Sequence, residues 1–135
     1  MSKETIEIKT SKEKFFLEYL VLKKPVIDNI LTRYNNGNKK TLSDAPRRVL
    51  AQLLYFNDKF RSMEDSKRYA NTFSKETKNQ ICDNLNIKEH YLNIYISQLR
   101  KLKIIDGKRI KNIFVIYAED SHMLNFTFKL NGYSQ

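Results

Sequence analysis

The sequence predicts an α+β fold in which three helices form a core and a β-hairpin follows near the C-terminal end. Three segments repeat apolar residues at helical spacing: 44–57, 75–85 and 88–102. Two later segments, 109–117 and 123–130, are the expected strands of the hairpin, and the second alternates apolar and polar residues. This order of elements gives the fold prediction for residues 41–135.

Residues 1–40 are expected to add a short strand and two helices. Thr5–Lys9 alternates apolar and polar residues, which favours an edge strand. Residues 11–22 read as an unusually apolar helix, and Pro25 suits the first turn of a second one. An Asn-Asn-Gly-Asn run ends that helix, so residues 35–41 are the best linker in the chain.

Two roles are open for these N-terminal helices. They either extend the core of the domain or form the interface of a dimer. Large apolar side chains would supply that interface, with Phe15, Phe16 and Tyr19 as its candidates. Dimerisation would place two copies of a DNA-reading helix about one duplex turn apart.

Polar residues mark the ends of the predicted core helices. Ser43 or Asp44 caps the first of them, and Pro46 is tolerated in its first turn. Ser74 caps the second. Residues 61–73 stay ambiguous because their apolar residues show little periodicity.

The net charge of +10 is concentrated in two segments. Residues 23–48 hold seven basic and two acidic residues, and residues 88–111 hold the same numbers. Two basic zones on a neutral body suit a polyanion such as nucleic acid. The alternative is an ordinary solvated lysine-rich surface.

Several functional classes lack support in the sequence. The only cysteine, Cys82, lies on the inner side of a predicted helix, which favours a small core residue over a nucleophile. His90 and His122 are the only histidines, too few for a zinc site, and the three glycines form no phosphate-binding loop. We therefore expect no enzyme, metal, cofactor, small-molecule ligand or membrane span. The expected location is the cytoplasm.

The segment 81–88 predicts a helix, a tight turn and a second helix. Asn86 falls at the turn, and asparagine tolerates the left-handed backbone that such turns use. Ile87 is placed to fill the angle between the helices, and Lys103–Gly107 returns the chain to the hairpin. This pattern resembles the winged helix-turn-helix family over about 90 residues.

The resemblance implies that the helix at 88–102 enters the major groove of DNA and that the hairpin follows the backbone. The residues implied to read bases are Lys88, His90, Tyr91, Asn93 and Gln98. Those implied to contact phosphates are Arg100, Lys101, Lys103, Lys108, Arg109 and Lys111. Duplex DNA is thus the expected partner, and regulation of transcription or replication the expected role.

Three features depart from the family's pattern and count against DNA reading. Tyr91 and Ile94 form an apolar stripe on the outer face of the same helix, the hairpin tip at 118–122 is acidic, and Lys103 stands where the family commonly has glycine. The run Arg48–Phe60, and the combination of Asn93–Ile105 with Phe126–Leu130, are also similar to small proteins of tailed bacteriophages, including the crAss-like group. The alternative is a virion component, such as a head–tail connector, that self-associates or binds other phage structural proteins.

Overall fold

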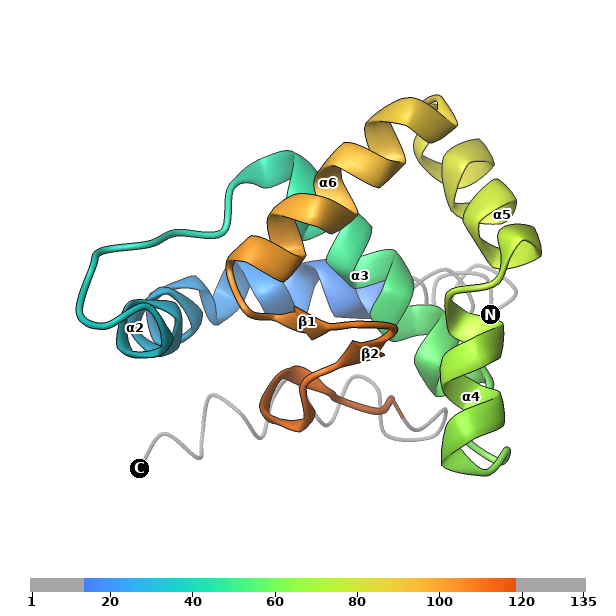
Figure 1. The fold of residues 1–135 in the computed structure, drawn as a ribbon, viewed down its shortest axis with the longest axis horizontal. Helices are drawn as coiled ribbons and strands as arrows, with labels where there is room; N and C mark the ends of the chain where they lie inside the picture. The colour runs from blue at the N-terminus through green and yellow to red at the C-terminus, as the bar shows by residue number, and fades with distance from the viewer. Residues whose placement is uncertain (1–13, 119–135) are drawn as a thin grey trace, which may run out of the picture.

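The structure, a computed structural model, describes residues 14–118 and is mostly helical over that range (Figure 1). Six α-helices, together with one 3₁₀ turn, make 68% of it helical. After an unlabelled helix at residues 14–22, the elements are α2 (Lys24–Tyr34), α3 (Asp44–Lys59), α4 (Asp65–Thr72), α5 (Lys75–Leu85), α6 (Glu89–Lys101), β1 (Ile105–Asp106), β2 (Arg109–Ile110) and the 3₁₀ turn η1 (Asn112–Phe114).

The predicted α+β winged helix-turn-helix fold is wrong. Within the described range the sheet consists of β1 and β2, which have two residues each and pair antiparallel. A three-helix core followed by a hairpin wing does not describe this arrangement, because helices make up nearly all of its regular structure. The fold is helical, with a minimal ribbon attached to the end of α6.

The first strand of the predicted hairpin is also wrong beyond Ile110. The chain reverses at Gly107–Lys108, so that Ile105 lies opposite Ile110, and residues 112–114 then form η1 instead of continuing the strand expected at 109–117. Gly107 has a φ of +66° and Lys108 a negative one, the pattern of a type II′ turn, which needs glycine first. The predicted strands at residues 5–9 and 123–130, and all but the first residue of the predicted tip at 118–122, lie outside the described residues.

The centre of the molecule is α3, which is covered from several sides (Figure 1). It packs against α4, α5 and α6. Val49, Leu50, Leu53 and Leu54 are fully inaccessible to solvent. Burial of four such side chains stabilises the fold by several kcal/mol, at about 1.5–3 kcal/mol each.

The helix at 14–22 and α2 join the same core. Phe16, Leu20 and Leu31 belong to the apolar cluster that surrounds α3. The ring of Phe16 meets that of Tyr55 in α3 edge to face, with centroids 6.4 Å apart. Residues on both sides of the predicted boundary after residue 40 therefore build one core.

Three helices end in the same closed turn, each with a residue other than glycine in the left-handed region. These residues are Asn36 after α2, Asn86 after α5 and Lys103 after α6, with φ of 61°, 55° and 67°. At the α5 end, the Ile87 N–H donates to the Cys82 carbonyl at 3.0 Å, the bond that defines a Schellman motif. The corner predicted at Asn86 is confirmed.

The predicted ends of α5 and α6 are confirmed. The Ser74 hydroxyl accepts a hydrogen bond from the Thr77 N–H at 3.1 Å and caps α5. Lys88 and Leu102 are the residues that flank α6. The ambiguous stretch at 61–73 contains the short helix α4, whose last residue, Thr72, is buried and bonds to the Arg68 carbonyl at 2.8 Å.

The loop after α2 is held against that helix by Asp28. Its carboxylate accepts hydrogen bonds from the Leu42 N–H at 3.1 Å, the Thr41 hydroxyl at 3.0 Å and the Lys24 ammonium at 2.6 Å. Burial by itself would raise the pKa of Asp28, but these donors outweigh it and lower the pKa below its usual value.

Replacing Asn86 tests the corner between α5 and α6. Asn86→Ala should lower the free energy of unfolding by about 1 kcal/mol, because alanine is strained at positive φ, whereas Asn86→Gly should stay within a few tenths of the wild type. Urea unfolding measures both. Asn79→Ala, on the exposed face of α5, is the matched control and should cost nothing. Equal losses for the alanine and glycine variants at 86 would contradict the strain.

Replacing Asp28 tests the anchor of the loop. The lowered pKa means that the carboxylate stabilises the fold above its unfolded pKa, and that this stability is lost as the pH falls through the folded value. Asp28→Asn should therefore cost about 1 kcal/mol at pH 7. The gap to wild type should close below about pH 4. Thermal unfolding followed from pH 7 to pH 2 measures it, and a gap independent of pH would argue against the anchor.

Candidate nucleic-acid interface

The helix α6 has one buried side and one side open to solvent. Leu92, Ile96 and Leu99 face the core and are almost fully inaccessible. The residues on the opposite side are exposed at spacings of three and four: His90, Ile94, Ser97 and Lys101. They form one continuous ridge, which we call the outward ridge of α6.

All five residues predicted to read bases are exposed. Lys88, His90 and Tyr91 lie at the start of α6, and Asn93 and Gln98 lie farther along it. Asn93 and Gln98 are five positions apart, which separates them by about 140° around a helix. The two amides therefore flank the outward ridge on opposite sides and cannot contact the same base pair.

The apolar stripe of the sequence analysis is also real and exposed. Tyr91 is 49% exposed and Ile94 is 38% exposed. The ring of His90 meets that of Tyr91 edge to face, with centroids 5.3 Å apart. The exposed apolar side chains of Tyr91 and Ile94 thus lie in the first half of the helix, and the exposed residues of the second half are polar or basic.

Among the predicted phosphate contacts, two arginines have partners inside the protein. Arg100 donates from Nε at 3.1 Å and from Nη2 at 3.0 Å to the Gly107 carbonyl, so it ties α6 to the hairpin turn. Arg109 lies beside Asp106, with Nη2 3.8 Å from the carboxylate. Both side chains remain exposed, but Arg100 has a clear structural role.

Two lysines of the same set meet at Tyr34, the last residue of α2. The Lys103 ammonium donates to the Tyr34 carbonyl at 3.1 Å, and the Lys111 ammonium lies 4.9 Å from the centre of the Tyr34 ring. Phe114 packs edge to face on the same ring at 6.3 Å. This junction joins the end of α6 and the hairpin to α2.

Lys101 and Lys108 differ from the other candidates. Both are exposed, and neither forms an ion pair or hydrogen bond with any side chain in residues 14–118. Lys101 ends the outward ridge and Lys108 is the second residue of the hairpin turn. Their ammonium groups are the ones best placed to meet an external anion.

The predicted protein-interface residues divide into two groups. Phe15 and Phe16 are buried in the core, with ring centroids 5.3 Å apart, so they do not face a second chain. Tyr19 is half-buried beside Phe15, and burial raises the pKa of its hydroxyl. Tyr91 and Ile94 are the two that remain on the surface.

Three basic residues without an individual role in the sequence prediction lie at the end of α2 and on the loop that follows it. Arg33, Lys39 and Lys40 are exposed on α2 and the loop after it. The available signal was the basic character of residues 23–48, because no local motif singles these three out.

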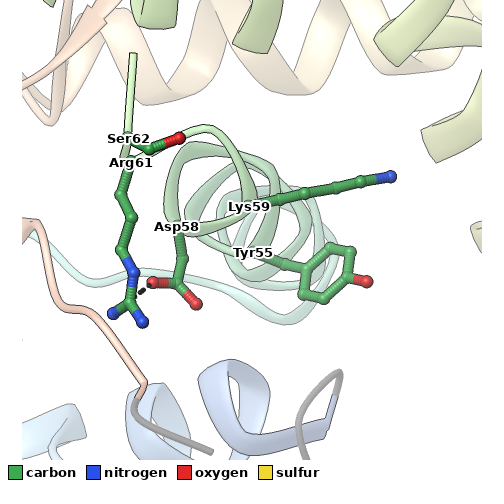
Figure 2. A pocket seen from close by; sticks show the side chains of 5 residues that line it. All are labelled: Tyr55, Asp58, Lys59, Arg61 and Ser62. Atoms are coloured by element: carbon green, nitrogen blue, oxygen red, sulfur yellow. Dashed lines mark ion pairs between the residues drawn. The ribbon is translucent and has the colours of Figure 1, made fainter. Parts of the chain in front are cut away.

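A polar hollow of about 280 Å³ lies at the end of α3 (Figure 2). Asp58 and Arg61 turn toward each other, 3.3 Å apart, while Tyr55 and Lys59 point to the other side. Arg61 also donates to the Ala118 carbonyl at 3.3 Å. These contacts link α3 to the last described residues, so we assign the hollow a structural role.

Other kinds of site find no support between residues 14 and 118. No three side chains of the metal-binding types gather there, and none of the helices in that range could cross a membrane. Cys82 is partly buried, and burial, with Glu89 and Asp83 nearby, raises the pKa of its thiol, which keeps it protonated. The chain was compared with protein-family models, curated proteins and solved structures, and it matches none of them.

Proposed function

We propose that this protein binds duplex DNA with the outward ridge of α6 in the major groove. The observation that carries the proposal is that this ridge is open along the whole helix and ends beside two unpaired lysines, Lys101 and Lys108. A helix of 13 residues is about 20 Å long, and a major groove about 12 Å wide accepts it.

The side chains of α6 supply the two kinds of contact that such binding needs. Asn93 and Gln98 carry amides that can bond to adenine edges, and Ser97 lies between them on the ridge. Lys101 and Lys108 supply positive charge for phosphates, which gives affinity and register without reading sequence. The Arg100–Gly107 bond fixes Lys108 relative to α6, so the two lysines are held in a set arrangement.

The salt dependence of binding tests the phosphate contacts. Affinity for a 20-base-pair duplex should fall steeply with salt, and Lys101→Gln/Lys108→Gln should reduce the slope of log K against log salt by about 1.8, at 0.9 per contact. Fluorescence anisotropy at several salt concentrations measures this slope.

The control has the same loss of charge in another place. Lys14→Gln/Lys67→Gln removes two exposed lysines from the helix at 14–22 and from α4, and should leave the slope nearly unchanged. Absence of wild-type binding at low salt would end the proposal. Equal slopes for the two double variants would show that α6 and the hairpin do not contact the phosphates.

A second candidate function is assembly with a protein through α6. It is favoured by the exposure of Tyr91 and Ile94, because an isoleucine at the centre of a groove-facing ridge gives no polar contact to a base edge. In this alternative the apolar half of α6 packs against a second copy of the chain or another protein.

Ile94→Asp separates the two functions. If α6 faces DNA, the carboxylate repels phosphates, and affinity for the duplex should fall by on the order of tenfold with the oligomeric state unchanged. If α6 is an assembly surface, the variant should lose self-association at unchanged DNA affinity. Sedimentation velocity and anisotropy measure the two properties on the same samples, with Ile94→Val as the conservative control. A variant unchanged in both would exclude Ile94 from either role.

A further inference from the structure

The loop between α2 and α3 has a fixed course, although its composition is that of a linker. The Gly37 N–H donates to the Thr32 carbonyl at 2.9 Å, and the Lys40 N–H reaches the Thr32 hydroxyl at 3.3 Å. Farther along, Asp28 holds Thr41 and Leu42. The loop is thus bonded to α2 at two levels, so its backbone follows a defined course.

The charges on this loop are all of one sign. Arg33, Lys39 and Lys40 are exposed, and residues 29–43 contain no aspartate or glutamate. The two acidic residues that flank this stretch are occupied. Asp28 bonds to Lys24 and to the loop backbone, and Asp44 pairs with Arg47 and Arg48 at 3.1 Å and 3.2 Å. Nothing in residues 29–43 neutralises the three cations.

The loop begins next to Tyr34, the residue of α2 that the basic C-terminal end of α6 contacts. Tyr34 receives the Lys103 ammonium on its carbonyl and the Lys111 ammonium on its ring. Figure 1 shows the loop leaving α2 and running to the start of α3. The two basic zones of the sequence, 69 positions apart at the Lys103–Tyr34 contact, are therefore neighbours in space.

We infer that the loop at residues 35–41, with Arg33, is a second phosphate-binding element that continues the surface of Lys101 and Lys108. It would contact the DNA backbone beyond the groove that holds α6. This inference rests on the proposed function, since it names an additional contact to the same duplex. Its physical basis is that a cation without an acidic partner can bind a phosphate and release a counterion from the DNA. Because the loop backbone is already ordered, binding requires little further ordering of the chain.

The test is Lys39→Gln/Lys40→Gln in the full chain, with anisotropy on the same 20-base-pair duplex. Two lost phosphate contacts should reduce the salt slope by about 1.8 and lower the affinity at 0.1 M salt by at least about tenfold. Lys14→Gln/Lys67→Gln is again the control, with equal net charge and lysines on other elements. Thermal unfolding should be unchanged, because both loop side chains are exposed.

The outcomes separate this inference from the proposed function. If wild type binds and Lys101→Gln/Lys108→Gln lowers the slope while the loop variant behaves as the control, the loop inference is overturned and the proposed function stands. If all four substitutions together lower the slope by about 3.6, both elements contact one duplex. If wild type does not bind at low salt, both ideas fail.

Discussion

The burial of α3 determines how the rest of the described chain can be used. Because α3 occupies the interior and packs against α4, α5 and α6, each of these helices needs only one apolar side. For α6 that side is the stripe of Leu92, Ile96 and Leu99, so its outer side is not needed for packing in the core. An exposed ridge on α6 is therefore a consequence of the packing. What distinguishes its outer side is that Tyr91, Asn93 and Ile94 lie in the first half, while Ser97, Gln98 and Lys101 lie in the second.

Local sequence signals were sufficient for most helix ends. Ser74 caps α5, Asn86 turns the chain and the apolar stripe defines α6, and each of these features acts within a few residues. The hairpin could not be placed in the same way. A strand was predicted over 109–117, but the turn requires a residue that accepts positive φ, and Gly107 supplies it earlier in the chain. The short helix α4 was missed because its anchor, the buried end at Thr72 and Phe73, depends on tertiary packing.

In the candidate site, the sequence gives the number of charges in a segment but does not show which of them have a partner in the folded protein. Arg100, Lys103 and Lys111 were grouped with Lys101 and Lys108 as equivalent phosphate contacts, yet the first three have partners in the protein: the Gly107 carbonyl and the two acceptors of Tyr34. The formal charge of the segment is unchanged by these contacts, but the mobility of its cations is reduced. Each contact also positions a neighbour, because Arg100 orients the turn that carries Lys108.

The direction of α6 gives a reason for this distribution of charge. A helix carries a partial negative charge at its C-terminal end, which disfavours an approaching phosphate, and Arg100 and Lys101 in the last turn offset it. At the other end, Glu89 in the first turn offsets the partial positive charge that would otherwise attract an anion. The charged side chains thus make the C-terminal half of α6 the more favourable half for a polyanion. The backbone dipole alone would favour an anion at the N-terminal end instead. Lys103 and Lys108 follow that half, and the Tyr34 junction joins it to α2, so several cations gather at the C-terminal end of α6. The apolar side chains of Tyr91 and Ile94 lie nearer the N-terminal end of the helix, where Glu89 contributes negative charge.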